Sequence, residues 1–211
     1  MGPDNRDGDP ERVPNPPREE LRSAKPSSAH AIALIEVASI ARGHRTADAM
    51  LKRAPVALLR AGFVSPGKFL VLVEGEVAAV DEAFRRGIDV AGDRLVDKLF
   101  LPQPHDELGP AVRGQASARG GVVVDALGVV ETGTVAATIV GADAATKAAA
   151  VRITEMQLGR GIGGKAFFTV TGSLAEVEAA VEAALGVLDA THVHTTEIIP
   201  APHADLVAKL R

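Results

Sequence analysis

Cysteine, tryptophan and tyrosine are absent from this chain of 211 residues, and aromatic residues make up only 3% of it. Without cysteine, the chain's own side chains can form no disulfide, no thiolate nucleophile and no cysteine-ligated zinc or iron–sulfur site. The scarcity of aromatic rings leaves few platforms on which bases, sugars or flavins could stack. We therefore expect no bound cofactor.

Charge and hydropathy argue against two further classes of partner. The net charge is −4 and the basic residues form no cluster, which argues against nucleic acid. No apolar run approaches the roughly 20 residues of a membrane-spanning helix, and the N-terminus has no apolar signal core. We expect a cytoplasmic protein that binds neither nucleic acid nor membranes.

The chain contains one unit twice. The first copy opens with AIALIEVAS at Ala31, and the second opens with ALGVVETGT at Ala126. A length change of two residues separates the copies just before a shared Gly-Lys pair. The duplication indicates a protein built from pairs of this unit. Equivalent residues lie 95, then 97, then 98 positions apart, as in Glu36 with Glu131, Gly67 with Gly164, and His105 with His203.

Composition divides the chain into four segments. Residues 1–29 hold six of the thirteen prolines and many interleaved charges, which is typical of a disordered extension. Residues 30–108 and residues 125–211 each hold one unit. Residues 109–124 are rich in Gly, Ser and Ala and are expected to form a linker.

Each unit has the same predicted order of elements, β-α-β-β-α-β. Apolar runs bounded by glycine or proline predict the strands, and alanine-rich or 3.6-periodic stretches predict the helices. This order is that of an α+β fold of ferredoxin-like type, with the helices on one face of a sheet. Apart from the second helix, the predicted ranges in the two copies are strands 32–37 and 127–130, helices 46–53 and 135–148, strands 56–59 and 151–156, strands 68–73 and 165–171, and strands 95–101 and 194–199.

The second helix of each unit has the clearest pattern. Val77, Val80, Phe84 and Ile88 form one apolar stripe, and the residues 97 positions later repeat it. A Ser-x-x-Glu capping box beginning at Ser173 predicts where the helix of the second copy starts.

The segment Gly159–Ala166 (GRGIGGKA) matches the spacing of two phosphate-binding motifs, G-x-G-x-x-G and an incomplete P-loop. Both motifs require the glycines to lead into a helix. The residues after Lys165 are strand-like, and Ala166 stands where a P-loop needs Ser or Thr. We interpret the segment as a glycine-rich turn, or as a loop whose backbone passes close to another part of the assembly.

Other candidate catalytic or metal-binding residues lack the partners that such chemistry needs. Ser65 has no histidine at a fixed spacing, and the pair His192 and His194 has no nearby third ligand for a metal. With no convergent acid, base or nucleophile, we expect no enzyme. His105 and His203 follow Pro-x-Pro in both copies, which predicts a structural role such as capping a following helix.

Two further pairs of polar residues recur in both copies. Glu36 and Glu131 lie within apolar first strands, where a carboxylate is more often paired across an interface or exposed at an edge than used as a base. Lys52 and Lys147 end the alanine-rich helices, where a positive charge complements the helix dipole. Their repetition favours a shared role at an interface.

Taken together, these residues resemble the bacterial microcompartment shell proteins, specifically the tandem-domain kind with unpermuted domains. The resemblance covers both repeats. It rests on the ALGVVETG opening, the A-D-A-x-x-K-x-A pattern at Ala47–Ala54 and Ala142–Ala149, the glycine-rich turn, and the P-x-P-H ends. Gln103 and Ala201 stand between those prolines, where many single-domain relatives carry an Arg that holds neighbouring tiles.

The resemblance implies a homotrimer whose six domains mimic a hexamer and tile with other shell proteins, hexamers and pentamers, around enclosed enzymes. It also implies that Lys52 and Lys147 lie at the edges where tiles meet. The turn between the second and third strands would line a central pore for metabolites. By this resemblance the pore residues are Val64, Ser65, Pro66 and Gly67 in the first copy, and Arg160, Gly161, Ile162, Gly163 and Gly164 in the second.

The same resemblance leaves the character of the pore open. Three inward copies of Arg160 would form a positive constriction favouring anionic metabolites. If they folded back onto carboxylates, the backbone and Ile162 would set the opening. Some tandem relatives hold an iron–sulfur cluster through cysteine, which this chain lacks. The alternatives to a shell protein are a trimeric small-molecule-binding regulator of ferredoxin-like fold and a small oligomeric enzyme.

Overall fold

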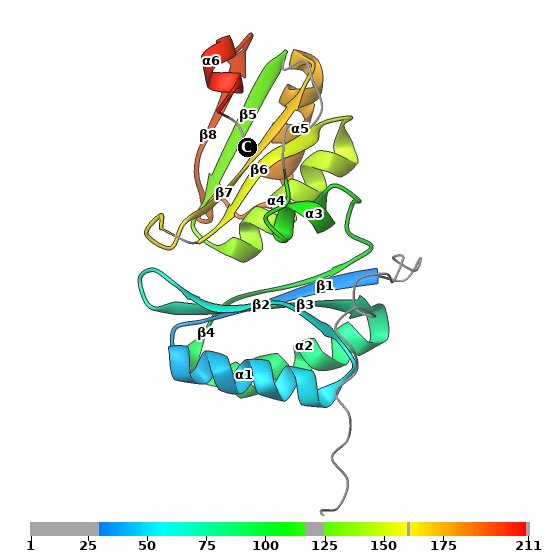
Figure 1. Ribbon diagram of the computed structural model, residues 1–211, viewed down its shortest axis with the longest axis vertical. Helices are drawn as coiled ribbons and strands as arrows, with labels where there is room; N and C mark the ends of the chain where they lie inside the picture. Colours follow the sequence, from blue (N-terminus) through cyan, green and yellow to red (C-terminus); the bar gives the residue numbers. More distant parts are fainter. Residues whose placement is uncertain (1–29, 117–124, 160, 210–211) are drawn as a thin grey trace, which may run out of the picture.

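The computed structural model describes residues 30–116, 125–159 and 161–209. Within them the chain forms two units, each an antiparallel sheet with two long helices on one face (Figure 1). The extension expected at residues 1–29, most of the expected linker and Arg160 lie outside the described residues. The two units confirm the duplicated, unpermuted ferredoxin-like fold that the sequence predicts.

The first unit follows the predicted order of elements. Its strands form a sheet of order β2-β3-β1-β4. The elements are β1 (His30–Val37), α1 (Ile40–Arg53), β2 (Ala57–Val64), β3 (Lys68–Glu76), α2 (Val77–Ala91), the short 3₁₀ turn η2 (Gly92–Arg94) and β4 (Leu95–Pro102).

The second unit repeats this order, and its sheet has the equivalent order β6-β7-β5-β8. A short helix precedes it and another ends it. The elements are α3 (Leu108–Val112), β5 (Ala126–Thr132), α4 (Val135–Ala148), β6 (Arg152–Leu158), β7 (Ala166–Gly172), α5 (Leu174–Val187), β8 (Val193–Pro200) and α6 (Ala204–Val207).

Several elements differ from their predicted extent; strand β2, for example, ends at Val64 and not at Leu59. Helix α1 begins at Ile40, six residues before the predicted start, where the Ser39 hydroxyl accepts a hydrogen bond from the Arg42 N–H at 3.2 Å. Charged residues near the start of α1 interrupt the apolar pattern, so the pattern did not predict this start. The expected linker also begins with α3, in which Leu108 and Ala111 are buried.

The second helices pack through smaller residues than the predicted stripe implies. In α2 the fully buried line runs through Val80, Ala83 and Gly87, whereas Phe84 and Ile88 are only partly buried. A Cβ on Gly87 would lie 2.8 Å from the sulfur of Met50, so α1 and α2 approach closely there. The capping box at Ser173 is present, which confirms the start of α5.

The buried apolar residues form two clusters. One lies between the first sheet and its own helices. The other combines the core of the second unit with the opposite face of the first sheet. The joint between the units is therefore continuous with a hydrophobic core. Among the described residues, no helix has the length and apolar character needed to cross a membrane.

Candidate functional site

The two units meet through the outer face of the first sheet, which is the face turned away from α1 and α2. Helices α3 and α4 of the second unit lie on this side (Figure 1), and α4 contacts β1 and β4. Leu34 and Leu99 from the sheet are buried in one apolar cluster with Ile139 of α4. Burial of such surface is the main favourable term at a joint of this kind.

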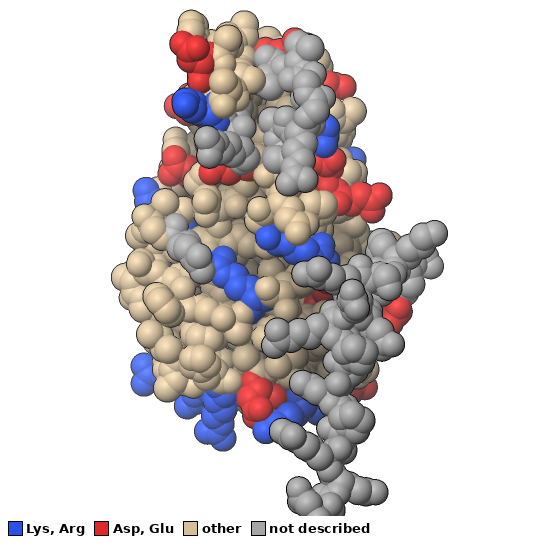
Figure 2. Space-filling view, in the orientation of Figure 1, with Lys and Arg blue, Asp and Glu red and all other residues tan. Residues whose placement is uncertain are grey.

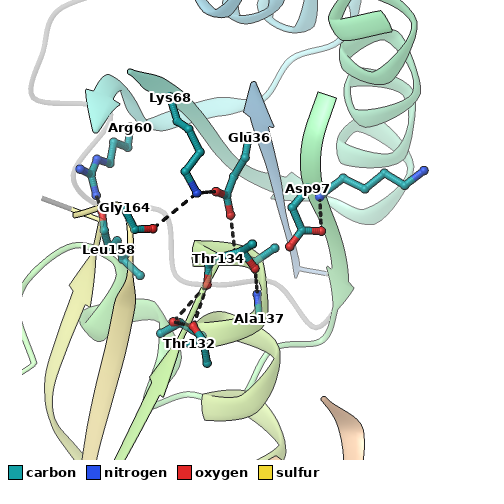
Figure 3. A network of polar contacts seen from close by, with 12 residues as sticks. Glu36, Arg60, Lys68, Asp97, Thr132, Thr134, Ala137, Leu158 and Gly164 are labelled. Atoms are coloured by element: carbon teal, nitrogen blue, oxygen red, sulfur yellow. Dashed lines mark hydrogen bonds and ion pairs between the residues drawn. The ribbon is translucent and has the colours of Figure 1, made fainter. Parts of the chain in front are cut away.

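The carboxylate of Glu36 is fully buried in this joint (Figure 3). Its Oε1 accepts a hydrogen bond from the Ala136 N–H at 2.9 Å, in the first turn of α4, and its Oε2 lies 3.3 Å from Lys68 Nζ. The N-terminus of a helix favours a negative charge there. Burial nevertheless raises the pKa of Glu36 above the usual range of a glutamate, because desolvation outweighs the effects of Ala136 and Lys68.

Lys68 also connects this carboxylate to the glycine-rich loop of the second unit. Its Nζ lies 3.4 Å from the Gly164 carbonyl oxygen (Figure 3). Gly164 has a φ of +83°, and a Cβ there would lie 2.6 Å from the Ser65 carbonyl oxygen. The two turns predicted to line a pore therefore pass each other backbone to backbone, at a distance that only glycine permits.

The other predicted pore residues have different surroundings. Val64 is buried and packs near Gly159, so its side chain belongs to the joint. Ser65, Pro66 and Gly67 are exposed. Gly161 and Gly163 are also exposed, Ile162 is half-buried, and a Cβ on either glycine would meet nothing within 4 Å.

Strand pairing locates the length change between the copies within these turns. Phe63 pairs with Phe69, and the equivalent Leu158 pairs with Ala166. Five residues lie between the first pair and seven between the second. The copies thus differ in length where their loops touch, while the strands on both sides keep the same register.

The end of the first unit docks onto the second unit. The His105 N–H donates to Asp143 Oδ1 of α4 at 2.8 Å, and Leu108 of α3 is fully buried in the core cluster of the second unit. The His105 imidazole accepts from the Glu107 N–H, and the His203 imidazole accepts from the Asp205 N–H at the start of α6. The predicted capping role is confirmed for His203, the N-cap of α6. His105 binds the residue just before α3, whose N-cap Glu107 has no side-chain cap bond.

The equivalent residues in the other half of the repeat make no contact with another unit of the described chain. Glu131 pairs with Lys165 at 3.9 Å and is 37% exposed, whereas Glu36 is 0% exposed. Leu206 of α6 is 43% exposed, whereas its counterpart Leu108 is buried. The surface that would receive these residues is the face of the first unit that carries α1 and β2.

That face of the first unit is apolar and uncovered. Phe63 is 72% exposed, and its counterpart Leu158 is 5% exposed. The same contrast holds for the other large apolar residues exposed on α1 and β2, each compared with the residue 95 positions later: Ile40 with Val135, Leu51 with Thr146, and Leu58 with Ile153.

The lysines predicted at tile edges occupy equivalent places at the ends of α1 and α4. Lys52 pairs with Asp48 at 2.8 Å, and Lys147 pairs with Asp143 at 2.6 Å, one helical turn earlier. Asp143 is the residue that holds the His105 N–H, so the Asp–Lys pair of α4 borders the joint. In α1 the equivalent pair is exposed.

Several candidate sites from the sequence do not form a chemical site in the structure. The glycines after Leu158 lead into strand β7, and not into a helix that could hold a phosphate. His194 is exposed at the start of β8. Among the described residues, no group of three or more His, Asp or Glu side chains is placed to hold a metal.

Sequence reasoning missed the part that α3 plays in the joint. Leu108, Ala111 and Val112 have helical apolar spacing directly after the first P-x-P-H, which was the available signal. The alanine and glycine content of the following residues favoured a linker. The sequence favoured pairing of Glu36 across an interface or exposure at an edge, but it did not identify the partner Ala136, which is 100 positions away.

Comparison with known proteins adds an independent finding. The BMC domain family matches residues 31–104 and, a second time, residues 126–202. The bacterial microcompartment shell protein PduT of Citrobacter freundii is 44% identical over 157 residues, covering 73% of this chain and 82% of that protein. Carboxysome shell protein CsoS1 of Parasynechococcus marenigrum (strain WH8102) is 40% identical over 85 residues, covering 39% of this chain and 82% of that protein.

A solved structure resembles the whole two-unit arrangement. The crystal structure of a microcompartments protein from Desulfitobacterium hafniense DCB has a TM-score of 0.75 and 41% sequence identity. The likeness covers 84% of this chain and 97% of that one.

Proposed function

Because this chain belongs to the BMC-domain family of bacterial microcompartment shell proteins, we propose that three copies form a ring-shaped tile of such a shell. The role of the protein in the shell is structural, as it is throughout this family. We infer that the chain catalyses no reaction, and that its other partners are neighbouring shell proteins, hexamers and pentamers among them, with enclosed enzymes on one side.

One observation carries the ring. The second unit buries its α4 and β6 face against the first unit, while the equivalent α1 and β2 face of the first unit is left uncovered, with Phe63 and Leu58 exposed. The matching surface of the second unit, which carries Glu131 and Leu206, is likewise not covered by another unit within the described chain. A head-to-tail joint between chains satisfies both surfaces at once, and such joints close into rings.

The expected contacts of this joint follow from the repeat. Glu131 of one chain would accept a hydrogen bond from the Ala41 N–H of the next chain, as Glu36 does from Ala136. Leu206 would enter the next chain's first unit, as Leu108 enters the second. Three chains supply six such units, the number implied by the family.

The turns of β2-β3 and β6-β7 would then surround the centre of the ring, three of each kind. Ser65, Pro66 and Gly67 would alternate with the longer loop of Gly161–Gly164, and Val64 would support the joint behind them. We propose that the three copies of Arg160 give the opening a positive charge that favours anionic metabolites. An Arg160→Ala variant should then reduce the permeability of assembled shells to anions, and unchanged permeability would reject the idea.

Lys52 and Lys147 would lie at the outer edge, where neighbouring tiles meet. Replacement of both lysines by alanine, which leaves Asp143 able to accept the His105 N–H, should leave the ring intact and reduce the formation of sheets or shells with single-domain partners. Electron microscopy of co-expressed proteins measures this, and sheets of normal extent would contradict the assignment.

Native mass spectrometry tests the ring directly. The purified chain should have three times the mass of one chain, and a Phe63→Asp variant should shift the population to single chains that remain folded. A monomeric wild-type protein at micromolar concentration would contradict the proposed ring.

A further inference from the structure

The joint within the chain is apolar at its centre. Leu99 of β4 is almost fully buried, and it lies in one core cluster with Ile139 of α4. Val140 of α4 packs against this cluster. Helix α4 lies against β1 and β4 at this place. The first sheet therefore receives the helix of the second unit with apolar side chains on both sides.

The repeat places different residues at the same positions of the joint between chains. Leu34 pairs with Leu99, and its counterpart Val129 pairs with Glu197, so Glu197 takes the place of Leu99. Ile198, the next residue of β8, packs toward the core of its own unit, so Glu197 is on the outer face. On the helix side, His44 and Arg45 of α1 take the places of Ile139 and Val140.

These polar residues are available for such a contact. Glu197, His44 and Arg45 are exposed. Among the described residues, the side chains of Glu197 and Arg45 form no ion pair or hydrogen bond within the chain. A carboxylate on the outer face of β8 and a guanidinium on α1 are thus left without an intrachain partner.

The surroundings of the two residues have opposite charge. A hollow at the start of α1 is lined by Arg42, Arg45 and Arg94, and Figure 2 shows basic side chains gathered along the lower edge of the view, where α1 and α2 lie. On the outer face of the second sheet, Glu131 lies two positions along β5 from Val129, the residue that pairs with Glu197. Charge complementarity therefore extends beyond a single pair.

We propose that the joint between chains contains an ion pair, Glu197 of one chain with Arg45 of the next, at the place where the joint within each chain is apolar. The proposal rests on the head-to-tail ring of the proposed function. Its occupant is a second copy of this chain, because the second sheet carries Glu131 and Glu197 at the positions that Glu36 and Leu99 occupy on the first sheet, where the equivalent helix is received.

This difference between the two joints gives the assembly a means of selecting its partner. A wrong joint that placed Arg45 against Leu99, or Glu197 against Val140, would bury a charge without a partner. One copy of the chain therefore binds another copy only with the second unit of one against the first unit of the next. A shell subunit with an apolar outer face would be disfavoured at the same place.

Charge reversal tests the pair. In Glu197→Lys the lysine meets Arg45, and in Arg45→Glu the new carboxylate meets Glu197, so each variant replaces attraction by repulsion at all three joints. We expect each to raise the midpoint concentration for ring formation about tenfold or more in low salt. Raising the salt to 1 M, where the screening length is about 3 Å, should reduce this difference. Glu178→Lys, which makes the same change of charge on the exposed side of α5, is the matched control and should not weaken the ring.

Two rescue experiments distinguish this pair from general damage. The double variant with both reversals in one chain restores all three joints and should recover the wild-type midpoint. A mixture of the two single variants can match only two of three joints, since an odd ring cannot alternate, and should recover less. Analytical ultracentrifugation at several salt concentrations measures all of these midpoints.

The outcomes separate this inference from the ring itself. If the wild-type protein is trimeric and both single variants assemble as well as it does, the pairing is rejected and the ring stands. If the double variant is as weak as the single variants, the pairing is likewise rejected. If the wild-type protein is monomeric under all these conditions, the ring and the pairing both fall.

Discussion

At the scale of single residues, the joint contains one carboxylate whose ionisation is linked to stability. Glu36 is surrounded by apolar groups and held by Lys68 and the start of α4. Because its pKa is raised in the folded state, the folded protein keeps this proton to a higher pH than the unfolded chain does. The contribution of this group to stability therefore falls as the pH rises from the ordinary glutamate pKa through the raised one.

A Glu36→Gln variant tests this sign. Glutamine can still accept the Ala136 N–H through its amide oxygen but does not titrate. The free energy of unfolding of the variant, relative to that of wild type, should increase as the pH rises from about 4 to 7, so that the variant becomes relatively more stable. Urea denaturation at a series of pH values measures the trend. Glu178→Gln, on the exposed side of α5, serves as the control, and an opposite slope for Glu36→Gln would contradict the assignment.

The contact between the two turns gives a second prediction at this scale. Gly164→Ala and Gly161→Ala both place a side chain at positive φ, which costs about 1–2 kcal/mol. Only at Gly164 would the new Cβ also collide with the Ser65 carbonyl oxygen. Gly164→Ala should therefore lower the free energy of unfolding by more than Gly161→Ala does. Equal losses in urea denaturation would mean that the turns do not touch.

At the scale of elements, α3 and α6 are equivalent segments in different surroundings. Leu108→Ala removes a fully buried side chain and should cost about 2–5 kcal/mol of folding stability. Leu206→Ala removes an exposed one, so it should leave the folding of the separate chain nearly unchanged and weaken the ring instead. Thermal unfolding of dilute protein and ring mass at higher concentration separate the two effects. A large loss of monomer stability in Leu206→Ala would contradict this.

Some features of the elements were predictable from the sequence alone, and others were not. The order of strands and helices was predictable because the apolar periodicity predicts the same element at equivalent positions of both copies. The start of α1 was not, because Arg42, His44 and Arg45 interrupt the apolar pattern there. The joint was not predictable for a different reason: in some equivalent pairs, such as Leu58 and Ile153, both residues are apolar although one is exposed and the other is buried.

At the scale of the whole molecule, the two units are unequal although their folds match. The second unit is covered by the first, and the first has an uncovered face. Ring formation would cover it, so the apparent stability should depend on protein concentration by mass action. The melting temperature of the wild-type protein should rise with concentration, whereas that of a Phe63→Asp variant should not. Calorimetry over a hundredfold range checks this, and a constant wild-type value would argue against a dissociable ring.

The unequal turns have a consequence for how such an opening could be altered. In a ring of six identical chains, any substitution in a turn appears six times. In the proposed ring, each turn would be encoded once and present three times, between three turns of the other kind; the two kinds are five and seven residues long. A substitution that adds one charge to one kind of turn would add three charges around the opening and would leave the turns of the other kind unchanged. The duplicated gene therefore permits adjustments of half the size that a single-unit gene allows.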